Sequence, residues 1–470
     1  MPSLPLRCAC NLTDASRRGT GGTGGWPRPG SARVGRRIAY DHRICPFPRC
    51  GPSTLSTTTL GRPAGATTTG ATRWVQLGLG LLCMMTVSSP QYVWALFTKP
   101  MAAAFGTGAA ALQVTITILI VLQTFFSPFQ GYLVQRFGPA PLIGLGAALT
   151  GLSWILASYA TSLTALYLSY GLLGGLGTGI VYVGVVGLVM GWFPEKRGFA
   201  AGIVAAGYGM GAIVTTFPIA DRLQSAGVQA TLFEFGLIFA VVGVLAAAGL
   251  RRPPLPAAVV GPASARDTAT GAMLRHPVFW LMFVMMALMS TTGLMVTTQI
   301  GFFAGDFGVT GATVLGMAAL PLALTIDRFC NGLTRPFFGA LSDRIGRENT
   351  MFVAFLLEAC AMTAWLLTRG DPVLFVLLSG VVFFGWGEIF SLFPSTLTDT
   401  FGTRDATANY GCLYIAQGVG SVLGGPMASL LHDGTGSWTT VFAVAIGADV
   451  LTAVLALAAL KPLRRRMLAA

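Results

Sequence analysis

The segment that decides the fold is NGLTRPFFGALSDRIGR, residues 331–347. Its first half is apolar enough to lie in a membrane and yet contains Arg335, which normally means that the arginine faces a protein interior or a water-filled cavity. Its second half has the pattern G-x-L-S-D-R-x-G-R, which predicts a tight, charged turn that holds two helix ends where they leave the membrane. The turn residues expected to act in gating are Gly339, Asp343, Arg344, Gly346 and Arg347. Together the two halves indicate a channel or carrier whose interior attracts anions.

The composition places the whole chain in the membrane class. Of its 470 residues 53% are hydrophobic and only 10% are charged, which a soluble globular domain would not show. The length leaves room for about twelve helices of about 20 apolar residues each. The net charge of +13 comes mostly from residues 1–73, which hold eleven Arg and two acidic residues. Because the basic residues are concentrated in a tail, no nucleic-acid partner is expected.

The tail itself, residues 1–72, is rich in Gly, Pro, Arg, Ser and Thr and cannot bury enough apolar surface to fold. It lacks the apolar core of a secretory signal. It resembles a transit peptide in being Arg-rich and poor in acidic residues, but its Pro and Gly would break an amphipathic helix. An unstructured extension, or a start codon assigned too early, is the interpretation we favour.

The cysteines divide evenly between the tail and the apolar segments. The spacing of the tail cysteines matches no ordinary zinc site, although His42 lies near two of them. They are Cys8, Cys10, Cys45 and Cys50. The others are interpreted as small packing residues: Cys83, Cys330, Cys360 and Cys412. Neither a metal ion nor a cofactor is expected.

Twelve apolar stretches predict an all-α membrane protein. They are residues 74–97, 109–134, 140–158, 163–192, 198–220, 231–250, 277–304, 311–341, 350–368, 372–399, 406–431 and 438–460. The predicted organisation is a disordered basic tail (1–72), a six-helix bundle (73–250), a cytoplasmic linker (251–275), a second six-helix bundle (276–460) and a basic cytoplasmic tail (461–470).

The distribution of Lys and Arg predicts the orientation in the membrane. An even number of spans puts both termini on one side. With that side inside, the inner loops and the carboxyl tail carry fourteen Lys and Arg, and the outer loops carry only Lys99, Arg222 and Arg369. Cytoplasmic loops are enriched in positive residues. Both termini are therefore expected in the cytoplasm, with the protein in the plasma membrane, or in the inner membrane of a bacterium.

An internal repeat divides the chain into halves. Gly131-Tyr-Leu133-Val-Gln-Arg136-Phe-Gly138 and Gly339-Ala-Leu341-Ser-Asp-Arg344-Ile-Gly346 share the pattern G-x-L-x-x-R-x-G at an offset of 208 residues. The same offset relates Phe193 to Phe401 and Lys196 to Arg404. Two pseudo-symmetric six-helix bundles in parallel orientation would place a substrate site between them, near the midplane of the membrane.

These features resemble the major facilitator superfamily. The first copy of the turn departs from the family pattern, with Gln135 where Asp is usual and Pro139 where a basic residue is usual. A closer likeness, to the oxalate/formate antiporter family, covers almost everything from Arg73 onwards. It rests on an ordered set of motifs: Gln91-Tyr92-x-Trp94, Trp192-Phe-Pro-x-Lys-Arg-Gly198, Ala206-Gly-Tyr208-Gly, Arg335-Pro-Phe-Phe-Gly339, Phe384-x-Trp386-Gly, Leu392-Phe-Pro-Ser395 and Asn409-Tyr-Gly411.

The resemblance implies a binding site. In that family an Arg in the R-P-F-x-G run of helix 8 and a Lys in helix 11 clasp a dicarboxylate inside a cage of aromatic side chains. Arg335 matches the Arg, whereas Gln417 stands at the position of the Lys. The matching cage positions are Tyr92, Tyr182, Tyr208, Trp386, Phe390 and Tyr414. Gln91 and Tyr92 either belong to the site or satisfy backbone groups freed where Pro90 kinks the first helix.

Two arginines compete for the role of ligand. Arg335 lies about 9 Å of helix from Leu341, so its side chain could also reach the membrane surface, and Arg328 is two turns deeper on nearly the same face. The resemblance favours Arg335, whose guanidinium can bind a carboxylate through two parallel hydrogen bonds. Arg328 is then expected to pair with Glu388, which could instead be a proton-coupling group. Asp327 and Glu358 are weaker candidates of the same kind.

The expected function is secondary transport of small carboxylate anions by alternating access, like that of an oxalate/formate antiporter. The protein is expected to act as a monomer in the lipid bilayer and not to be an enzyme. Gln417 can donate a hydrogen bond but supplies no charge, and a dianion facing one fixed cation would bring one negative charge too many into a low-dielectric site. Proton-coupled symport of monocarboxylates such as formate or pyruvate-like acids is therefore the alternative. A membrane sensor that binds a carboxylate without moving it is a third hypothesis.

Overall fold

The structure, a computed structural model, describes residues 70–107, 109–253, 267–309 and 311–469. The predicted tail up to residue 69, with its four cysteines, and residues 254–266 of the predicted linker lie outside the described residues. Helix begins at Gly70, three residues before the predicted first bundle.

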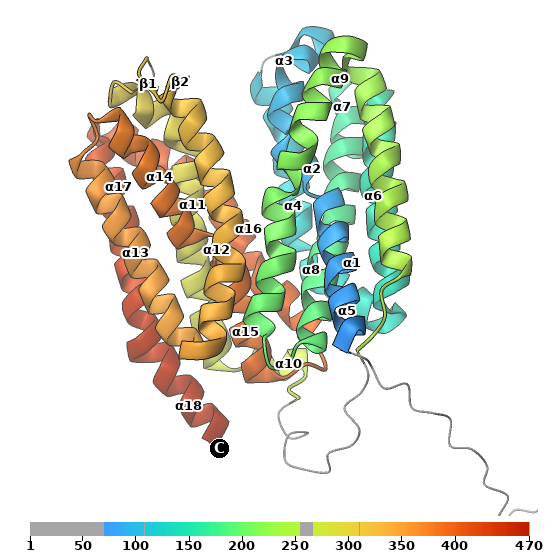
Figure 1. The fold of residues 1–470 in the computed structure, drawn as a ribbon, viewed down its shortest axis with the longest axis vertical. Coiled ribbons are helices and arrows are strands. Elements are labelled where there is room, and N and C mark those ends of the chain that lie inside the picture. The colour runs from blue at the N-terminus through green and yellow to red at the C-terminus, as the bar shows by residue number, and fades with distance from the viewer. Residues whose placement is uncertain (1–69, 108, 254–266, 310, 470) are drawn as a thin grey trace, which may run out of the picture. The chain divides into compact units, whose positions relative to one another are not determined.

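The described chain is almost entirely helical and forms two bundles (Figure 1). The first bundle contains α1 (Gly70–Thr86), α2 (Ser89–Tyr92), α3 (Trp94–Phe105), α4 (Ala109–Phe125), α5 (Ser127–Phe137), α6 (Pro139–Ser158), α7 (Leu163–Leu166), the π-helix η1 (Tyr167–Leu173), α8 (Gly174–Trp192) and α9 (Arg197–Ala248). The second contains α10 (Thr270–Met273), α11 (Pro277–Asp306), the strands β1 (Thr313–Val314) and β2 (Met317–Ala318), α12 (Ala319–Ile345), α13 (Arg347–Leu367), α14 (Pro372–Trp386), α15 (Ile389–Phe401), α16 (Ala406–Thr435), α17 (Trp438–Leu455), the π-helix η3 (Ala456–Leu460) and α18 (Lys461–Ala469).

These elements correspond to the twelve predicted spans. By length and composition, seven helices of the described chain could cross a membrane, or nine if each of two bent helix pairs is one span. The 52-residue α9 is interrupted at Gly227 (φ 79°, ψ −179°), where the chain reverses, so it supplies two spans. The other two predicted stretches correspond to the long helices α12 and α16, which are more polar and are not among the helices counted by length and composition.

Two boundaries differ from the prediction. The sequence Gly339–Arg347 is not a turn but largely helix: α12 continues to Ile345, and only Gly346 (φ 93°, ψ 152°) separates it from α13. In addition, residues 313–318, predicted as part of a span, form the hairpin of β1 and β2. Both turn residues of this hairpin, Leu315 and Gly316, have positive φ, as a two-residue turn between twisted strands favours.

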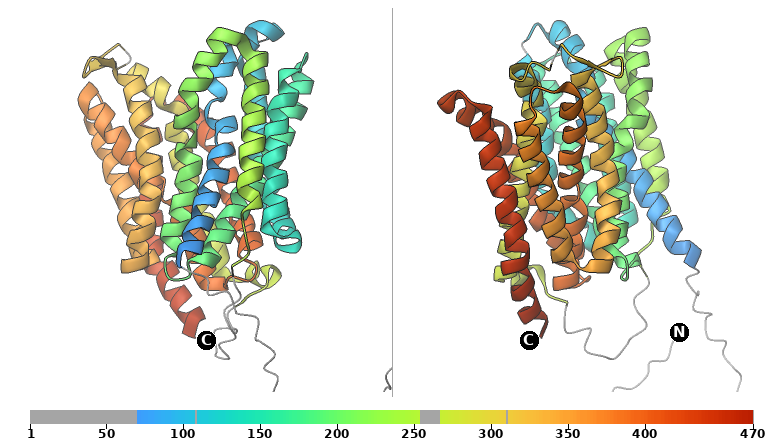
Figure 2. Two further views of the ribbon diagram at one scale, coloured as in Figure 1. Left: turned by 45° about the vertical axis from the view of Figure 1, so that its right-hand side comes forward. Right: turned by 60° about the vertical axis from the view of Figure 1, so that its left-hand side comes forward.

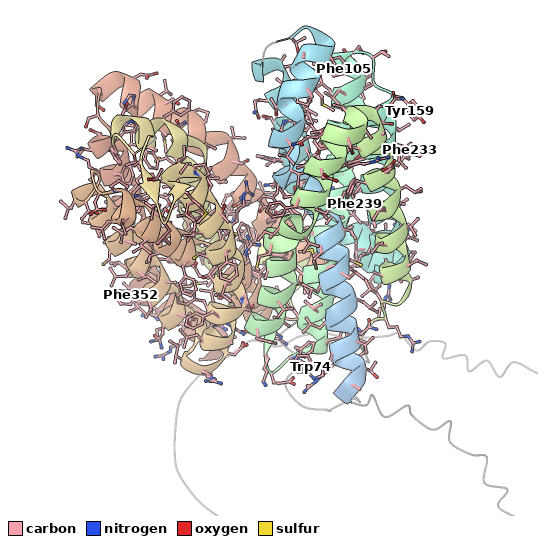
Figure 3. The ribbon with its side chains drawn as sticks, turned by 45° about the horizontal axis from the view of Figure 1, so that its top comes forward. Trp74, Phe105, Tyr159, Phe233, Phe239 and Phe352 are labelled. Atoms are coloured by element: carbon pink, nitrogen blue, oxygen red, sulfur yellow. The ribbon has the colours of Figure 1, made fainter. Side chains whose placement is uncertain are left out.

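One end of the helices carries the start of α1 and the end of α18 (Figures 1 and 2). We call it the inner end, because the charge distribution predicts that it faces the cytoplasm, and the opposite end the outer end. Exposed aromatic residues lie near both: Tyr159 and Phe233 pack edge to face at the outer end, and Trp74 lies at the inner end (Figure 3). Aromatic side chains at both ends are typical of helices that cross a membrane.

The bundles touch along two seams at the inner end. In the first seam α9 packs against α12, and the backbone of Gly198 meets Gly339 so closely that a Cβ on Gly339 would lie 2.2 Å from the Gly198 oxygen. In the second α5 packs against α16, and a Cβ on Gly131 would lie 2.6 Å from the Thr407 oxygen. Glycine allows such close helix approach. The two glycines are related by the predicted offset of 208 residues.

Candidate substrate site

A cavity of about 280 Å³ lies between the two bundles, above the seams. All nine residues predicted to bind substrate line it: Gln91, Tyr92, Tyr182, Tyr208, Arg335, Trp386, Phe390, Tyr414 and Gln417. They come from α2, α8, α9, α12, α14, α15 and α16, so both bundles contribute. Further lining residues, among them Ile116, Thr297 and Leu324, lie in the outer halves of α4, α11 and α12. The cavity therefore opens toward the outer end and is closed at the inner end.

Arg335 is the most deeply buried charge of the cavity, at 1% exposure. Its Nη1 donates to the carbonyl oxygen of Ala205 at 2.6 Å, across the seam to α9. Its Nη2 and Nε donate to the side-chain and backbone oxygens of Asn331, at 2.6 and 3.2 Å. Gly209 makes room for the guanidinium, since a Cβ there would lie 3.2 Å from Cζ. The arginine is thus fixed in direction before any ligand binds.

Aromatic rings surround this guanidinium and the cavity beside it. Phe390 lies under the guanidinium, with 4.4 Å between Cζ and the ring centroid, and Trp386 meets Phe390 edge to face. Tyr182 stacks on Tyr414 across the two bundles, with ring centroids 4.7 Å apart. Tyr208 contacts both Tyr182 and Tyr92 edge to face. The aromatic positions expected from the resemblance therefore form two groups that line the same cavity, one of Trp386 and Phe390 and one of the four tyrosines.

Sequence reasoning missed several polar residues of the cavity, among them Gln123 and Asn331. Gln123 of α4 donates from Nε2 to the hydroxyl oxygens of Tyr208, at 3.1 Å, and Tyr414, at 3.2 Å, and so links the bundles. It could have been noticed as a polar residue inside an apolar stretch. Asn331, which holds Arg335, could have been found from its spacing, because residues four apart share a helix face.

Gln417 lines the cavity from α16, at the position where the resemblance expects Lys. It is 8% exposed, and its Oε1 accepts no hydrogen bond from the described residues. Gln91, by contrast, accepts a hydrogen bond from the hydroxyl of Tyr208 at 2.6 Å. Of the two glutamine side chains, Gln417 has more of its hydrogen-bonding capacity free for a ligand.

The predicted ion pair between Arg328 and Glu388 is wrong for this conformation. Glu388 is fully buried in the second bundle, accepts no hydrogen bond from the described residues and interacts electrostatically with Glu358 and Asp449. Arg335 is the cation that acts on Glu388 electrostatically, but the two groups are too far apart to form an ion pair. The reason is helical geometry: two residues after Trp386 the side chain points about 200° away from it. If Trp386 faces the cavity, Glu388 cannot.

A charged latch holds the first seam at the inner end. Asp343 accepts hydrogen bonds from the backbone N–H groups of Gly198 and Phe199, at 3.1 and 2.9 Å, at the amino-terminal end of α9. Carboxylates are stabilised at this end of a helix. Arg347 pairs with Asp343 at 2.6 Å and with Asp399 at 2.8 Å.

The remaining members of the predicted turn take different parts. Gly339 lies in the seam and Gly346 forms the break between α12 and α13. Arg344 is exposed and forms no ion pair with the described residues; as the residue after Asp343, it points about 100° away from that carboxylate around α12. Arg197 completes the latch by pairing with Asp399 at 2.7 Å, from the first bundle to the second.

The second seam has no equivalent carboxylate among the described residues. At the position related to Asp343 stands Gln135, whose backbone oxygen accepts a hydrogen bond from Arg252. The loop before α16 receives its carboxylate from Asp267 instead, which accepts the N–H groups of Thr403 and Arg404 at 3.1 and 3.3 Å. Asp267 belongs to the same half of the chain as α16, so this contact does not join the bundles.

The arrangement has the groups needed to bind an anion. Among the residues that the structure describes, no group of three or more His, Cys, Asp or Glu is placed to hold a metal ion. What the cavity offers is guanidinium groups, amide and hydroxyl donors and aromatic faces, a combination suited to carboxylates.

Comparison with known proteins agrees with this geometry. Residues 77–330 and 322–468 match the family model of the Major Facilitator Superfamily. The oxalate:formate antiporter of Oxalobacter formigenes is 34% identical over 380 residues, which cover 79% of this chain and 88% of that protein. Monocarboxylate transporter 13 of Bos taurus is 29% identical over 350 residues, covering 73% and 79%.

Solved structures share the fold alone. The proton:xylose symporter XylE superimposes with a TM-score of 0.67 at 13% identity, over 83% of this chain and 96% of its own. The fucose:proton symporter FucP of E. coli gives a TM-score of 0.64 at 14% identity, over 82% and 98%. These matches, together with the two bundles and the shared cavity, identify the chain as a multi-pass membrane transporter of the Major Facilitator Superfamily, in the family of the oxalate:formate antiporter.

Proposed function

We propose that this transporter exchanges small carboxylate anions of the oxalate and formate type across the plasma membrane, or across the inner membrane of a bacterium, with both termini in the cytoplasm. The observation that carries the proposal is Arg335, buried in a cavity between the bundles with its guanidinium already oriented by Asn331 and Ala205. A relative that is 34% identical and named for oxalate and formate supports the same class of cargo.

The hydrogen bond of Arg335 across the first seam offers a way to couple carboxylate binding to alternating access. Its Nη1 spans the first seam to the carbonyl oxygen of Ala205, so a carboxylate that takes this donor weakens a contact between the bundles. A ligand shifts a conformational equilibrium only through its different affinity for the two states. Bound carboxylate would therefore favour the state in which the seam opens and the cavity faces the other side of the membrane.

Proton-coupled symport of a monocarboxylate is the second candidate. It is favoured by Gln417, which gives the cavity no charge at the position of the family's Lys, and by the similarity to monocarboxylate transporter 13. Under symport, uptake of formate would follow an imposed pH gradient in vesicles that contain no counter-substrate. Under exchange, uptake would need a carboxylate on the opposite side and would not follow the pH gradient.

The test uses purified protein in liposomes. Vesicles loaded with formate or oxalate should take up labelled oxalate, and Arg335→Gln should lower kcat/KM at least about a hundredfold, because a charge-assisted bidentate contact contributes about 3 kcal/mol or more. Arg335→Lys should restore little, since a point charge cannot form the two parallel bonds. Arg222→Gln, whose ion pair with Glu234 lies outside the cavity, is the matched control.

The outcomes separate the hypotheses. Binding of carboxylates without flux, over several carboxylates and pH gradients, would support a sensor and contradict transport. Flux that persists in Arg335→Gln with unchanged kinetics would remove Arg335 from the site.

A further inference from the structure

Arg328 is a cation of the cavity that forms no ion pair and no hydrogen bond with the described residues. It lines the cavity two turns before Arg335 on α12 and is exposed to it. Its guanidinium lies over the ring of Tyr92, with 5.4 Å between Cζ and the ring centroid. Arg335, in comparison, is buried and gives three hydrogen bonds to protein oxygens.

The two arginines lie at opposite ends of one tyrosine cluster. Arg328 lies over Tyr92, Tyr92 contacts Tyr208 with ring centroids 5.6 Å apart, and the residue after Tyr208 is Gly209, which packs against the Arg335 guanidinium. Seven residues of helix separate the two Cα atoms by about 10 Å. The Arg335 side chain runs back along the helix to Asn331, and so toward Arg328. A carboxylate compound between them can meet one guanidinium at each end.

One acidic residue, Asp327, also lines the cavity. It is adjacent to Arg328 in sequence but about 100° away around the helix, it is only 4% exposed, and it forms no ion pair with Arg328. The two charges interact electrostatically, but no ion pair fixes the Arg328 guanidinium to Asp327, so its positive charge can face the open part of the cavity.

We propose that Arg328 is the second cationic ligand of the transport site and that it supplies, from α12, the positive charge that Gln417 does not supply from α16. The proposal rests on the function proposed above and makes it more specific. Two guanidinium groups can balance the two charges of a dicarboxylate in a low-dielectric cavity, whereas a monocarboxylate needs only Arg335. Arg328 is then the residue that decides preference between dianions and monoanions.

The experiment compares oxalate with formate in liposomes at neutral pH. Arg328→Gln should raise the KM for oxalate about tenfold or more while the KM for formate changes less than about threefold. Arg328→Lys should keep most of the preference, because it keeps the charge. The double variant Arg328→Gln with Gln417→Lys should recover oxalate transport, since it moves the charge to α16. Arg222→Gln again controls for a change in surface charge.

A second arm compares a single folded variant before and after chemical modification. Arg328→Cys, with the eight native cysteines replaced by Ser, is measured before and after reaction with a positively charged aminoethyl or a neutral ethyl thiosulfonate. Recovery of oxalate preference with the positive reagent alone supports the proposal. Equal changes for oxalate and formate, or equal effects of the two reagents, overturn it. If the unmodified wild type exchanges neither anion, the proposed function fails instead.

Discussion

Replacing Gly202 by alanine would place a methyl group inside the backbone of the opposite bundle. Gly202 lies on α9 in the first seam, and a Cβ there would be 2.3 Å from the carbonyl oxygen of Arg335 and 2.8 Å from the Cα of Pro336. These are backbone atoms, which cannot turn aside as a flexible side chain can. Helices α9 and α12 must therefore separate by about 1 Å to reach ordinary contact distances.

Gly202→Ala should destabilise only the conformation in which the inner end is closed. Overpacking of this kind costs about 1–3 kcal/mol, and the contact exists while the inner end is closed. A cost of about 2 kcal/mol changes the equilibrium between inward-facing and outward-facing forms about thirtyfold. We expect Gly202→Ala to move the population toward the inward-facing form and to weaken capture of carboxylate from the outer side.

Labelling of a reporter cysteine measures this shift. Leu324 lines the outer part of the cavity, and Leu324→Cys in a cysteine-free background should react with a membrane-impermeant maleimide several times more slowly when Gly202→Ala is present. Gly447→Ala is the neutral control, because a methyl group at Gly447 would meet no heavy atom within 4 Å. Gly151→Ala, whose Cβ would lie 2.4 Å from the Gly236 oxygen within the first bundle, is the control for overpacking alone. An unchanged labelling rate in Gly202→Ala, or an equal change in Gly151→Ala, would refute the reasoning.

Two further outcomes are expected. Gln417→Lys alone should raise the affinity for oxalate relative to formate, because it adds a positive charge to the cavity. Competition assays with both anions measure this, and an unchanged ratio of the two affinities would mean that Gln417 does not contact the transported anion. Asp399→Asn should weaken its ion pair with Arg197 across the first seam and its pair with Arg347 within the second bundle. Because a partly exposed pair contributes up to roughly 1 kcal/mol, the inward-facing forms should increase by up to about fivefold. Labelling of an inner-end cysteine measures the increase, and a rate equal to the wild type would exclude a role for Asp399 in closure.

Much of the site could be predicted from the sequence because its residues carry the family resemblance in order. Arg335, Gln417 and the aromatic positions all reach the same cavity. The surroundings of Arg328 could not be predicted in the same way. A short spacing from Trp386 suggested that Glu388 faces the cavity, but residues two apart on a helix point in opposite directions, and the structure places Glu388 inside the second bundle.

The limits of the helices were harder to predict for a different reason. Hydropathy does not detect where backbone dihedral angles change sign, and such changes separate the elements at Gly227, Leu315, Gly316 and Gly346. The charged residues after Gly339 suggested a turn. In the structure Asp343 and Arg347, which are four residues apart, instead form an ion pair at the junction of α12 and α13. The charged residues therefore did not mark the end of the helix.

The unequal seams have a mechanical consequence. Along α9 and α12 the contacts are directional: the carboxylate of Asp343 must meet two particular N–H groups, and the guanidinium of Arg335 one particular carbonyl. Along α5 and α16 the contact consists of close glycine packing and a hydrogen bond from the Ser127 hydroxyl to the Gly411 carbonyl. Helices packed through small residues can change their angle while they stay in contact, whereas directional hydrogen bonds must break before the helices move. We therefore expect the axis of rotation to lie along α5 and α16, so that the inner end opens by separation of α9 from α12 once these directional bonds break.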